Sequence, residues 1–594
     1  MDRPIAIGCM RLSTAPERDD DAAIETLHAA LDGGVRLLDT ADAYAHHPKD
    51  IGHNERLIAR ALAPWPGDRA TGQVAPPGGL TRPGGQWVPA GRATHLSAAC
   101  EASLRALAVE RIDLYQLHAP DPRTPMRTSV RALAKLQRDG LVRDLGLCNV
   151  TVAQIEEASA EIEIAAVQVE LGPFTDAAVR GGVAEHCLRR GIRVLAHRPL
   201  GGAKLHAKLA GHPALAAVAR RHDRTPAEIA LAWIRGLAAH IVPLPGPTRP
   251  LTARSCAAIE SIVLADVDLA QLDAAFAFAD LLRRSQSQRR APDDSDGEVV
   301  VLMGMPGAGK TTRALELVGR GYTRLNRDVE GGRLADLVPR LATALERGVR
   351  DVVLDNTYAA RAARNEVIET AWRHGVRVRC IFADTPIEQA RMNAVRRMLE
   401  EHGRLLGPDE IAKLARRQPT ALAPRAQLDF QRDLEPPTAD EGFCAIDRVA
   451  FERAAVADRP HRVLVVDVDR VLAEPIAAPL RAELRRHADE GWILAGFIWR
   501  PTEDARIPPE VAALRERIVD TLGVPFDLRC CPHPGGAPIC WCRPPMPGLV
   551  ATLLRDHDAA PARSRLLGAT PHAERFAAGC GLPWLAAQSL GGAG

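Results

Sequence analysis

Short apolar runs alternate with amphipathic stretches along most of the chain. In residues 1–283 these runs include Val35–Leu38, Ile112–Tyr115, Ala165–Gln168 and Ile192–Ala196, each separated from the next by stretches with helical spacing of apolar residues. A strand followed by a helix, repeated over this length, is typical of a (β/α)₈ barrel. The pattern therefore predicts a TIM barrel as the first domain.

Two further α/β blocks follow the predicted barrel. Residues 284–297 are polar and charged without periodicity, which is typical of a linker. Residues 298–455 again alternate apolar and amphipathic stretches, and a third block, residues 460–594, begins with the apolar run Val463–Val466. We therefore expect an α/β multidomain protein with three folded domains.

Length and charge narrow the class of protein. The chain of 594 residues exceeds one domain several-fold, and its 76 basic residues balance 74 acidic ones, so any site for a polyanion must be local. No apolar run approaches the about 20 residues of a membrane span, and no signal sequence follows Met1. We expect a cytoplasmic protein without membrane contact. Most of the twelve cysteines are scattered singly, as reduced thiols are, but several cluster between Cys530 and Cys542.

A glycine-rich segment lies between a predicted strand, Val299–Met303, and a predicted helix, Thr312–Val318. It reads G-M-P-G-A-G-K-T, which has the spacing and flanks of a phosphate-binding loop, whereas a chance glycine-rich turn is the alternative. Backbone N–H groups and the helix N-terminus would hold ATP phosphates, with Lys310 at the β- and γ-phosphates and Thr311 at Mg²⁺. The predicted ATP-binding residues are Gly304, Gly307, Gly309, Lys310, Thr311 and Thr312.

Several motifs of the first block occur together. They are Asp39–Tyr44 (D-T-A-D-A-Y), Asp113–His118, Leu145–Val150, Pro199–Gly202 and Leu244–Arg249. In this order they resemble the aldo-keto reductase family, which implies hydride transfer from NADPH to a carbonyl group. The resemblance assigns Tyr44 as the acid, with Asp39 and His118 as its catalytic partners. It places the cofactor against Asn149, Gln168 and Arg249.

One catalytic member of that family is missing. The family pairs the aspartate with a lysine that lowers the pKa of the tyrosine, and Pro77 stands at the lysine position. A tyrosine without such help has a pKa near about 10 and is a poor acid at neutral pH. Arg82 lies nearby in sequence, and Cys148 replaces the family's serine before Asn149. We expect a barrel that keeps its fold and loses turnover, with a working reductase as the alternative.

The middle block resembles the 5′-hydroxyl polynucleotide kinases. The resemblance rests on Asn326-Arg327-Asp328, on Asp355-Asn356-Thr357 after a predicted strand, and on Asn393 followed by Arg396 in a predicted lid helix. It implies Asp328 as the general base and Arg396 on the transferring phosphoryl group. The implied catalytic residues are Lys310, Asp328, Arg396 and Asp355. The implied substrate-binding residues are Arg327, Arg333, Asn356, Thr357, Arg361 and Arg364, although Arg333 is offset from the family position.

The last block resembles the zinc-bearing haloacid dehalogenase phosphatases. Asp467 and Asp469 end an apolar run as the family's nucleophile and acid/base do, and Cys531, His533, Cys540 and Cys542 match the family's zinc pattern. Three thiolates and an imidazole suit a structural zinc. However, Trp499, Pro544 and Ala569 stand where the family has other catalytic residues. We expect a domain that folds, binds Zn²⁺ and lacks efficient phosphatase activity.

The leading hypothesis is an ATP- and Mg²⁺-dependent kinase whose acceptor is the 5′-hydroxyl end of RNA or DNA. The barrel and the last block would then be degenerate modules that bind substrate, cofactor or partners. Three alternatives remain open at this point. They are a small-molecule or nucleoside kinase, a sensor or scaffold that binds NADPH and ATP, and an active NADPH-dependent oxidoreductase.

Overall fold

The computed structural model describes residues 5–67, 73–283, 292, 295–415, 418, 421–452, 459–472 and 475–587, without the side chains of residues 203 and 204. The predicted linker 284–297 lies mostly outside the described residues. The described chain divides into two compact units, residues 1–290 with 361–366 and residues 291–360 with 367–594. The two predicted α/β blocks after the barrel therefore share one unit.

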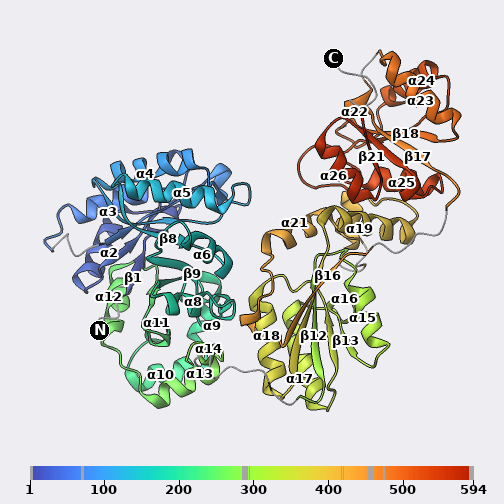
Figure 1. Ribbon diagram of the computed structural model, residues 1–594. Coiled ribbons are helices and arrows are strands. Elements are labelled where there is room, and N and C mark those ends of the chain that lie inside the picture. Colours follow the sequence, from blue (N-terminus) through green and yellow to red (C-terminus); the bar gives the residue numbers. More distant parts are fainter. Residues whose placement is uncertain are drawn as a thin grey trace. The chain divides into compact units, whose positions relative to one another are not determined.

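The first unit is built on parallel strands surrounded by helices (Figure 1). The strands are β1 (Ala6–Gly8), β2 (Leu37–Asp39), β3 (Gln73–Ala75), β4 (Pro77–Gly78), β7 (Ile112–Leu117), β8 (Val142–Cys148), β9 (Ala166–Glu170), β10 (Arg193–His197) and β11 (Ile241–Leu244). Strands β1, β2 and β3 pair in that order, and β4, which continues from β3, pairs with β7 at the edge of the sheet β7-β8-β9-β10-β11. Gly8 N donates to Pro245 O at 2.9 Å and closes the ring between β1 and β11. These strands form the (β/α)₈ barrel that the pattern predicts.

A layer of apolar side chains fills the barrel. It comprises Ala6, Leu37, Ala75, Leu114, Ala166, Leu195, Val242 and Leu244, one or two from most of the strands. Because side chains alternate along a strand, Asp39 follows Leu37 toward the interior, and Pro77 follows Ala75. Both residues of the altered catalytic set therefore lie on the inner side of the barrel wall.

Helices cover the outside of the barrel, and a short hairpin, β5 (Leu80–Thr81) with β6 (Val88–Pro89), follows β4. The helices are α1 (Arg11–Thr14), α2 (Asp20–Asp32), α3 (His53–Leu62), α4 (Ala93–Leu107), α5 (Met126–Arg138), α6 (Val152–Ser159), α7 (Ala177–Arg180), α8 (Val183–Arg190), α9 (Ala203–Ala210), α10 (Pro213–His222), α11 (Pro226–Leu237), α12 (Pro250–Ala258), α13 (Asp266–Ala275) and α14 (Ala279–Arg283). Local signals start several of them: Thr151 begins α6 with a capping box to Gln154, and Thr225 does so for α11 with Glu228.

The second unit begins with a parallel sheet of order β13-β14-β12-β15-β16. Its strands are β12 (Glu298–Gly304), β13 (Thr323–Leu325), β14 (Val352–Asp355), β15 (Arg377–Asp384) and β16 (Ala445–Ala450). Its helices are α15 (Lys310–Val318), α16 (Arg327–Glu330), α17 (Leu337–Glu346), α18 (Arg361–Arg373), α19 (Ile387–His402), α20 (Pro408–Leu414) and α21 (Pro424–Asp433). Fully buried valines of β12 place this strand in the middle of the sheet, so the loop after it leaves the sheet at its centre.

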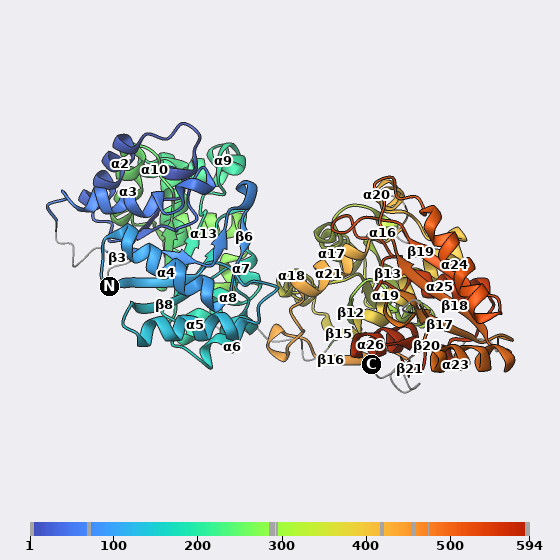
Figure 2. The ribbon, with the colours of Figure 1, turned by 90° about the horizontal axis from the view of Figure 1, so that it is seen from above.

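A second parallel sheet, of order β19-β18-β17-β20-β21, completes this unit. Its strands are β17 (Val463–Asp467), β18 (Ile493–Trp499), β19 (Asp527–Cys531), β20 (Arg565–Gly568) and β21 (Trp584–Ala586). Its helices are α22 (Val468–Val471), α23 (Ala478–Asp489), α24 (Pro509–Leu522), α25 (Gly548–Asp556) and α26 (Pro571–Cys580). Helices α25 and α26 lie beside α19 of the preceding block (Figure 2). Among the described residues, no helix has the length and apolar character that crossing a membrane requires.

Candidate functional site

The glycine-rich loop after β12 has the backbone that phosphate binding needs. Gly304, Gly307 and Gly309 all have positive φ, at 148°, 89° and 87°, and α15 begins directly at Lys310. A Cβ on Gly307 would lie 2.4 Å from the carbonyl oxygen of Ala390, so only glycine fits there. Helix α15 starts two residues before Thr312, where the sequence pattern predicted it to begin. Lys310 and Thr311 consequently lie in the first turn of the helix, beside the phosphate position.

Three side chains hold the loop from its outer side. Gln427 donates to Pro306 O at 2.7 Å, Asn393 to Gly307 O at 2.9 Å and Thr385 to Ala308 O at 3.2 Å. These bonds fix the carbonyl groups of the loop away from the site, and the opposite N–H groups are left for an anion. Gln427 and Thr385 were not predicted from the sequence, because they lie far along the chain and belong to no motif.

The loop opens into a pocket of about 980 Å³ in the described part of the chain. Most of the predicted kinase residues line it: Gly307, Gly309, Lys310, Thr311, Thr312, Arg327, Asp328, Asp355, Asn356, Thr357 and Arg396. Arg333, Arg361 and Arg364 are not among the lining residues. The Arg333 side chain is 85% exposed and pairs with Asp336, and Arg364 is fully buried. Their predicted contact with an acceptor stays a prediction that this pocket does not support.

Lys310 lies among charges of both signs in this pocket. Its ammonium group donates to Met305 O at 2.9 Å, inside the loop that would surround a phosphate. Burial lowers the pKa of Lys310 to about 8, with Arg397 acting in the same direction and Asp355 and Asp328 opposing it. The coupling of Lys310 to both carboxylates indicates that the three groups face one space.

The two carboxylates of the pocket differ in environment. Asp355, at the end of β14, is buried, and its Oδ2 accepts from Arg324 at 2.5 Å and from Asn326 at 3.2 Å. Asp328 is exposed and pairs with Arg327 at 3.1 Å. Asn326 accepts from the N–H groups of Asp328 and Val329 at the start of α16. Arg324 and Asn326 thus hold Asp355 in place, whereas the Asp328 carboxylate is exposed in the pocket with Arg327 as its partner.

In the barrel, the predicted reductase residues come together after β2 and β7. The rings of Tyr44 and His118 meet edge to face with centroids 5.7 Å apart, and Asp39 acts electrostatically on Tyr44. Burial raises the pKa of Asp39 to about 8, although a hydrogen bond from Gln168 opposes the shift, and Asp39 Oδ1 has no partner among the described residues. Burial and a lesser effect of His197 lower the pKa of His118 to about 3, so this imidazole is neutral.

No cation replaces the missing lysine within the described residues. Burial raises the pKa of Tyr44 well above its usual value, and the acidic groups around it, Asp39 foremost, raise it further. Arg82 instead stacks on Trp87, with its guanidinium carbon 3.7 Å from the ring centroid. None of the described ion pairs joins Arg82 to Asp39. The environment of Tyr44 therefore opposes the acidity that carbonyl reduction needs.

The three cofactor residues predicted for the barrel lie within its strands or in the loops that follow them. Asn149 follows β8 with φ of 56°, is exposed, and exchanges hydrogen bonds with His118 O and the His197 ring. Gln168 in β9 accepts from Gln116 at 3.0 Å. Arg249 is exposed at the N-terminus of α12, where a helix and a guanidinium both favour an anion.

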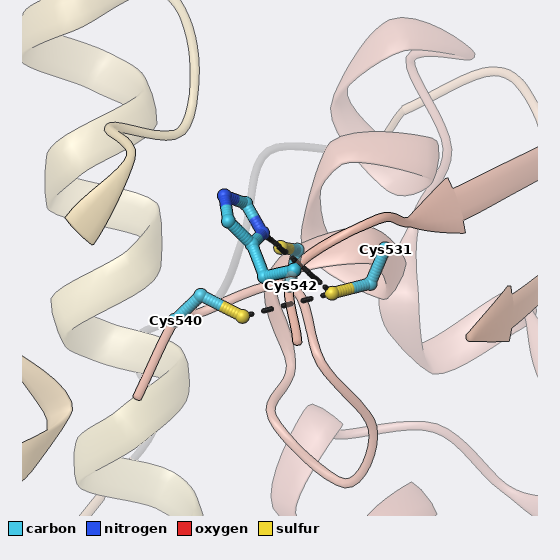
Figure 3. Close-up of side chains that lie close together, drawn as sticks. Cys531, Cys540 and Cys542 are labelled. Carbon is cyan, nitrogen blue, oxygen red and sulfur yellow. Dashed lines mark hydrogen bonds between the residues drawn. The ribbon is translucent and has the colours of Figure 1, made fainter. Parts of the chain in front are cut away.

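In the last block, four soft donors converge after β19 (Figure 3). The ligand atoms of Cys531, His533, Cys540 and Cys542 all lie within 4.8 Å of one another. Cys531 Sγ is 3.6 Å from Cys540 Sγ and 3.3 Å from Cys542 Sγ, near the about 3.7 Å between two sulfur atoms on one tetrahedral zinc. The donor set and spacing fit a closed tetrahedral metal site.

The predicted phosphatase carboxylates lie at the end of β17 and are occupied by protein groups. Asp469 pairs with Arg500 at 2.7 Å and accepts from Trp499 N at 3.2 Å. Burial raises the pKa of Asp467 to about 6; Arg470 opposes this shift, and Asp469 adds to it. The resemblance expects a small hydroxyl residue near the end of β18, and Trp499 is the last residue of this strand. Asp469 therefore accepts from the backbone N–H of Trp499 there, rather than from a phosphate-binding side chain.

The fold defines a multidomain α/β protein with a (β/α)₈ barrel and a P-loop nucleotide-binding block. Residues 4–277 match the aldo/keto reductase family, and residues 299–420 match an AAA domain. An uncharacterized oxidoreductase of Schizosaccharomyces pombe, C215.11c, is 30% identical over 277 residues, which are 46% of this chain and 85% of that protein. A probable aldo-keto reductase 1 of Glycine max is 28% identical over 307 residues, 47% of this chain and 86% of that protein. Through its first half, the chain belongs to the aldo/keto reductase family.

The chain is also similar to solved structures. The glycerol dehydrogenase AKR11B4 of Gluconobacter oxydans is 26% identical, with 47% of this chain and 92% of that chain covered and a TM-score of 0.41. An aldo-keto reductase of Klebsiella pneumoniae in complex with NADPH is 23% identical, with 46% and 90% covered and a TM-score of 0.39.

Proposed function

We propose that the chain is an ATP-dependent kinase whose phosphoryl transfer takes place in the P-loop pocket of the second unit. One observation carries this proposal: Lys310 and Thr311 of the loop share a single pocket with the exposed carboxylate of Asp328 and the arginine Arg396. A phosphate-binding loop alone defines a nucleotide site. An exposed carboxylate in the same pocket adds the general base that an acceptor hydroxyl requires.

Each of these residues has its own role in the phosphoryl transfer. Asp328 takes the proton of the acceptor hydroxyl, whose oxygen forms a bond to the γ-phosphorus while the bond to the β–γ bridging oxygen breaks and ADP leaves. Lys310 and the loop N–H groups hold the β- and γ-phosphates, and Arg396 and Arg397 face the charge on the transferring group. Mg²⁺ bound at the exposed Thr311 hydroxyl supplies further charge neutralisation.

The acceptor that fits best is the 5′-hydroxyl end of a polynucleotide. At about 980 Å³ the pocket is at the upper end of the range for small-ligand sites, about 1,000 Å³, so it has room for ATP and the end of an acceptor. Arg313 and Arg327 line its wall in ion pairs with Glu316 and Asp328, and a phosphodiester next to the reacting hydroxyl would compete for their guanidinium groups. A small-molecule or nucleoside acceptor is the second choice, since Arg333 does not reach the pocket.

An acceptor screen tests this proposal. Transfer from γ-labelled ATP is measured to RNA and DNA oligonucleotides with 5′-hydroxyl ends, to nucleosides and to sugars. We expect the label to be transferred to the oligonucleotides and not to the nucleosides. Transfer to nucleosides but not to oligonucleotides would show that the acceptor is a nucleoside rather than a polynucleotide end. Labelling of no acceptor would favour a nucleotide-dependent scaffold.

For the barrel, we propose a pocket that binds NADPH with little or no turnover. Arg249 at the start of α12 suits the 2′-phosphate of the cofactor, and the exposed Asn149 at the end of β8 suits its nicotinamide amide. NADPH supplies a hydride when bound, but among the described residues no cation faces the buried Tyr44 and would let it give a proton to the carbonyl oxygen. NADPH fluorescence titration should show binding. Steady, carbonyl-dependent NADPH oxidation would instead support the alternative of an active oxidoreductase.

For the last block, we propose one Zn²⁺ on Cys531, His533, Cys540 and Cys542 and no efficient phosphatase activity. The convergence of the four donor atoms supports the metal, and the Asp469–Arg500 pair supports the loss of phosphatase chemistry. Metal analysis of the purified chain should find about one zinc per chain. A double variant, Cys540→Ser with Cys542→Ser, should lose it. Zinc retained in that variant would refute this ligand set.

A further inference from the structure

The cysteine loop, residues 531–542, contacts the wall of the nucleotide pocket. Trp541 stands between Cys540 and Cys542, two of the four candidate metal ligands, and only 1% of it is exposed. Its indole N–H donates to Leu422 O at 2.7 Å. Leu422 itself lines the nucleotide pocket. A single side chain therefore links the metal-ligating residues to the pocket wall.

Further contacts join the two blocks around this link. We call residues 387–414 and 421–423 the lid segment; it includes α19 and α20. Arg555 of α25 donates to Gly403 O at 2.6 Å, directly after α19. Gly548 N donates to Trp541 O at 3.0 Å, and a Cβ on Gly548 would come within 2.9 Å of Leu405. The lid segment thus packs closely against the cysteine loop and α25.

The same packing is continuous with the apolar core. Met398, Leu406 and Ala421 of the lid segment and its surroundings belong to one buried cluster with Cys540 and Trp541. On its other side, α19 carries Asn393, which holds Gly307 O, and Arg396 and Arg397, which line the pocket. The lid segment therefore lies between the phosphate loop and the cysteine loop, and a shift of one side displaces groups on the other.

We propose that metal binding at the cysteine loop sets the position of the pocket wall, with Trp541 as the positioning residue that holds Leu422. This inference rests on the proposed nucleotide site. Metal ligation of Cys540 and Cys542 fixes the backbone on both sides of Trp541 and thereby the direction of its N–H group. Without the metal, the loop loses its cross-links and the hydrogen bond to Leu422 O loses its support. Nucleotide affinity is then coupled to metal occupancy, and the coupling is reciprocal.

The test measures the affinity of the full chain, loaded with zinc, for a fluorescent ATP analogue. Trp541→Phe keeps an aromatic ring but removes the N–H donor and part of the ring volume, and we expect about fivefold weaker binding. Trp492→Phe is the matched control, because Trp492 is also buried in this block but its N–H has no partner among the described residues. We expect wild-type affinity for this control.

Zinc removal supplies the second arm. A chelator selective for zinc over Mg²⁺ should weaken nucleotide binding of the wild type by at least the about fivefold expected for Trp541→Phe. The chelator should weaken nucleotide binding of Trp541→Phe by less, because zinc removal and this substitution both disrupt the hydrogen bond from Trp541 to Leu422 O. The ATP analogue should in turn raise the zinc affinity of the wild type by the factor by which zinc raises nucleotide affinity.

The outcomes separate this inference from the proposed function. A wild type that binds no ATP analogue would overturn the proposed kinase, and the inference with it. A wild type that binds ATP, with unchanged affinity in Trp541→Phe and after zinc removal, would overturn the inference alone. A lowered melting temperature of Trp541→Phe with unchanged nucleotide affinity would likewise assign Trp541 a purely structural role.

Discussion

The P-loop pocket and the barrel pocket differ in whether their buried carboxylates have a cation nearby. In the P-loop pocket, buried Asp355 has Arg324 at 2.5 Å, and Lys310 faces two carboxylates. In the barrel, Asp39 is just as deeply buried, yet no described cation faces it, and its pKa rises to about 8. A buried charge is retained only where an opposite charge compensates its desolvation. The difference supports our proposal that the first pocket carries charge-based chemistry and that the barrel pocket has little or no turnover.

The comparison also separates what holds the barrel together from what its proposed chemistry needs. The barrel retains its strands, its closure between β1 and β11, and the contact of Tyr44 with His118. One substitution at the position of Pro77 removes the counter-charge without a change in this framework. The catalytic effect of a missing member of a charged set is far larger than its effect on the fold.

The largest expected effect is that of Lys310→Ala. Removing the ammonium group takes away the charge at the β- and γ-phosphates, and we expect phosphoryl transfer to fall by about a thousandfold or more. Labelled-phosphate transfer under saturating ATP measures it. Lys413→Ala, an exposed lysine on α20, should keep the wild-type rate. Equal transfer by wild type and Lys310→Ala would remove the distinction between the two pockets.

The next effect is a gain in the barrel. Pro77→Lys places an ammonium group on the inner side of the barrel wall, on the side that Asp39 faces, and should lower the pKa of both Asp39 and Tyr44. We expect carbonyl-dependent NADPH oxidation to rise at least about tenfold over the wild type. Pro76→Lys is the matched control, because alternation turns position 76 away from the interior. A wild type that already turns over steadily, or an equal gain in both variants, would contradict our account of the barrel.

A smaller effect concerns pH. The pKa of Lys310 is lowered to about 8 in the free protein, and the triphosphate binds the protonated lysine better. Affinity for an ATP analogue should therefore be constant below pH 8 and fall as the pH rises above it, by at most about tenfold per pH unit. Lys310→Arg keeps its charge over this range and should lack that fall. A flat profile for the wild type between pH 7 and 9.5 would argue against a buried lysine at the phosphates.

The smallest expected effect is on stability. Asp39 has a raised pKa in the folded state, so folding takes up a proton, and the barrel should lose stability as the pH rises from about 4 to about 8. Asp39→Asn removes this dependence and should raise the melting temperature of the barrel near pH 8. The exposed Asp139→Asn should leave the pH profile as it is. A wild-type profile that is flat over this range would show that another group compensates Asp39.

Much of this architecture could be predicted from local patterns. The apolar runs correspond to strands such as β7, β9 and β10, and the barrel follows from their repetition. The phosphate loop and its glycines follow from one short motif, because positive φ values and the helix start are local properties. The boundaries are less well predicted, since α15 begins at Lys310 rather than Thr312.

Contacts between distant segments could not be predicted in this way. Gln427 and Thr385 hold the phosphate loop from positions far along the chain, and Arg324 pairs with Asp355 across neighbouring strands. The resemblance implied that Arg364 contacts the substrate, but the side chain is fully buried, because tertiary packing decides which helix face meets solvent. Such pairings depend on the order of strands in the sheet, which no local pattern specifies.

The most direct test of the central claim is single-turnover phosphoryl transfer to a 5′-hydroxyl oligonucleotide by the wild type and by Asp328→Asn. This variant keeps the size of the side chain and removes the base, while Lys310 and the loop still hold ATP. We predict unchanged affinity for an ATP analogue and a transfer rate lower by about 10² to 10⁴. Transfer by Asp328→Asn at the wild-type rate would contradict the assignment of the P-loop pocket as the catalytic site with Asp328 as its base.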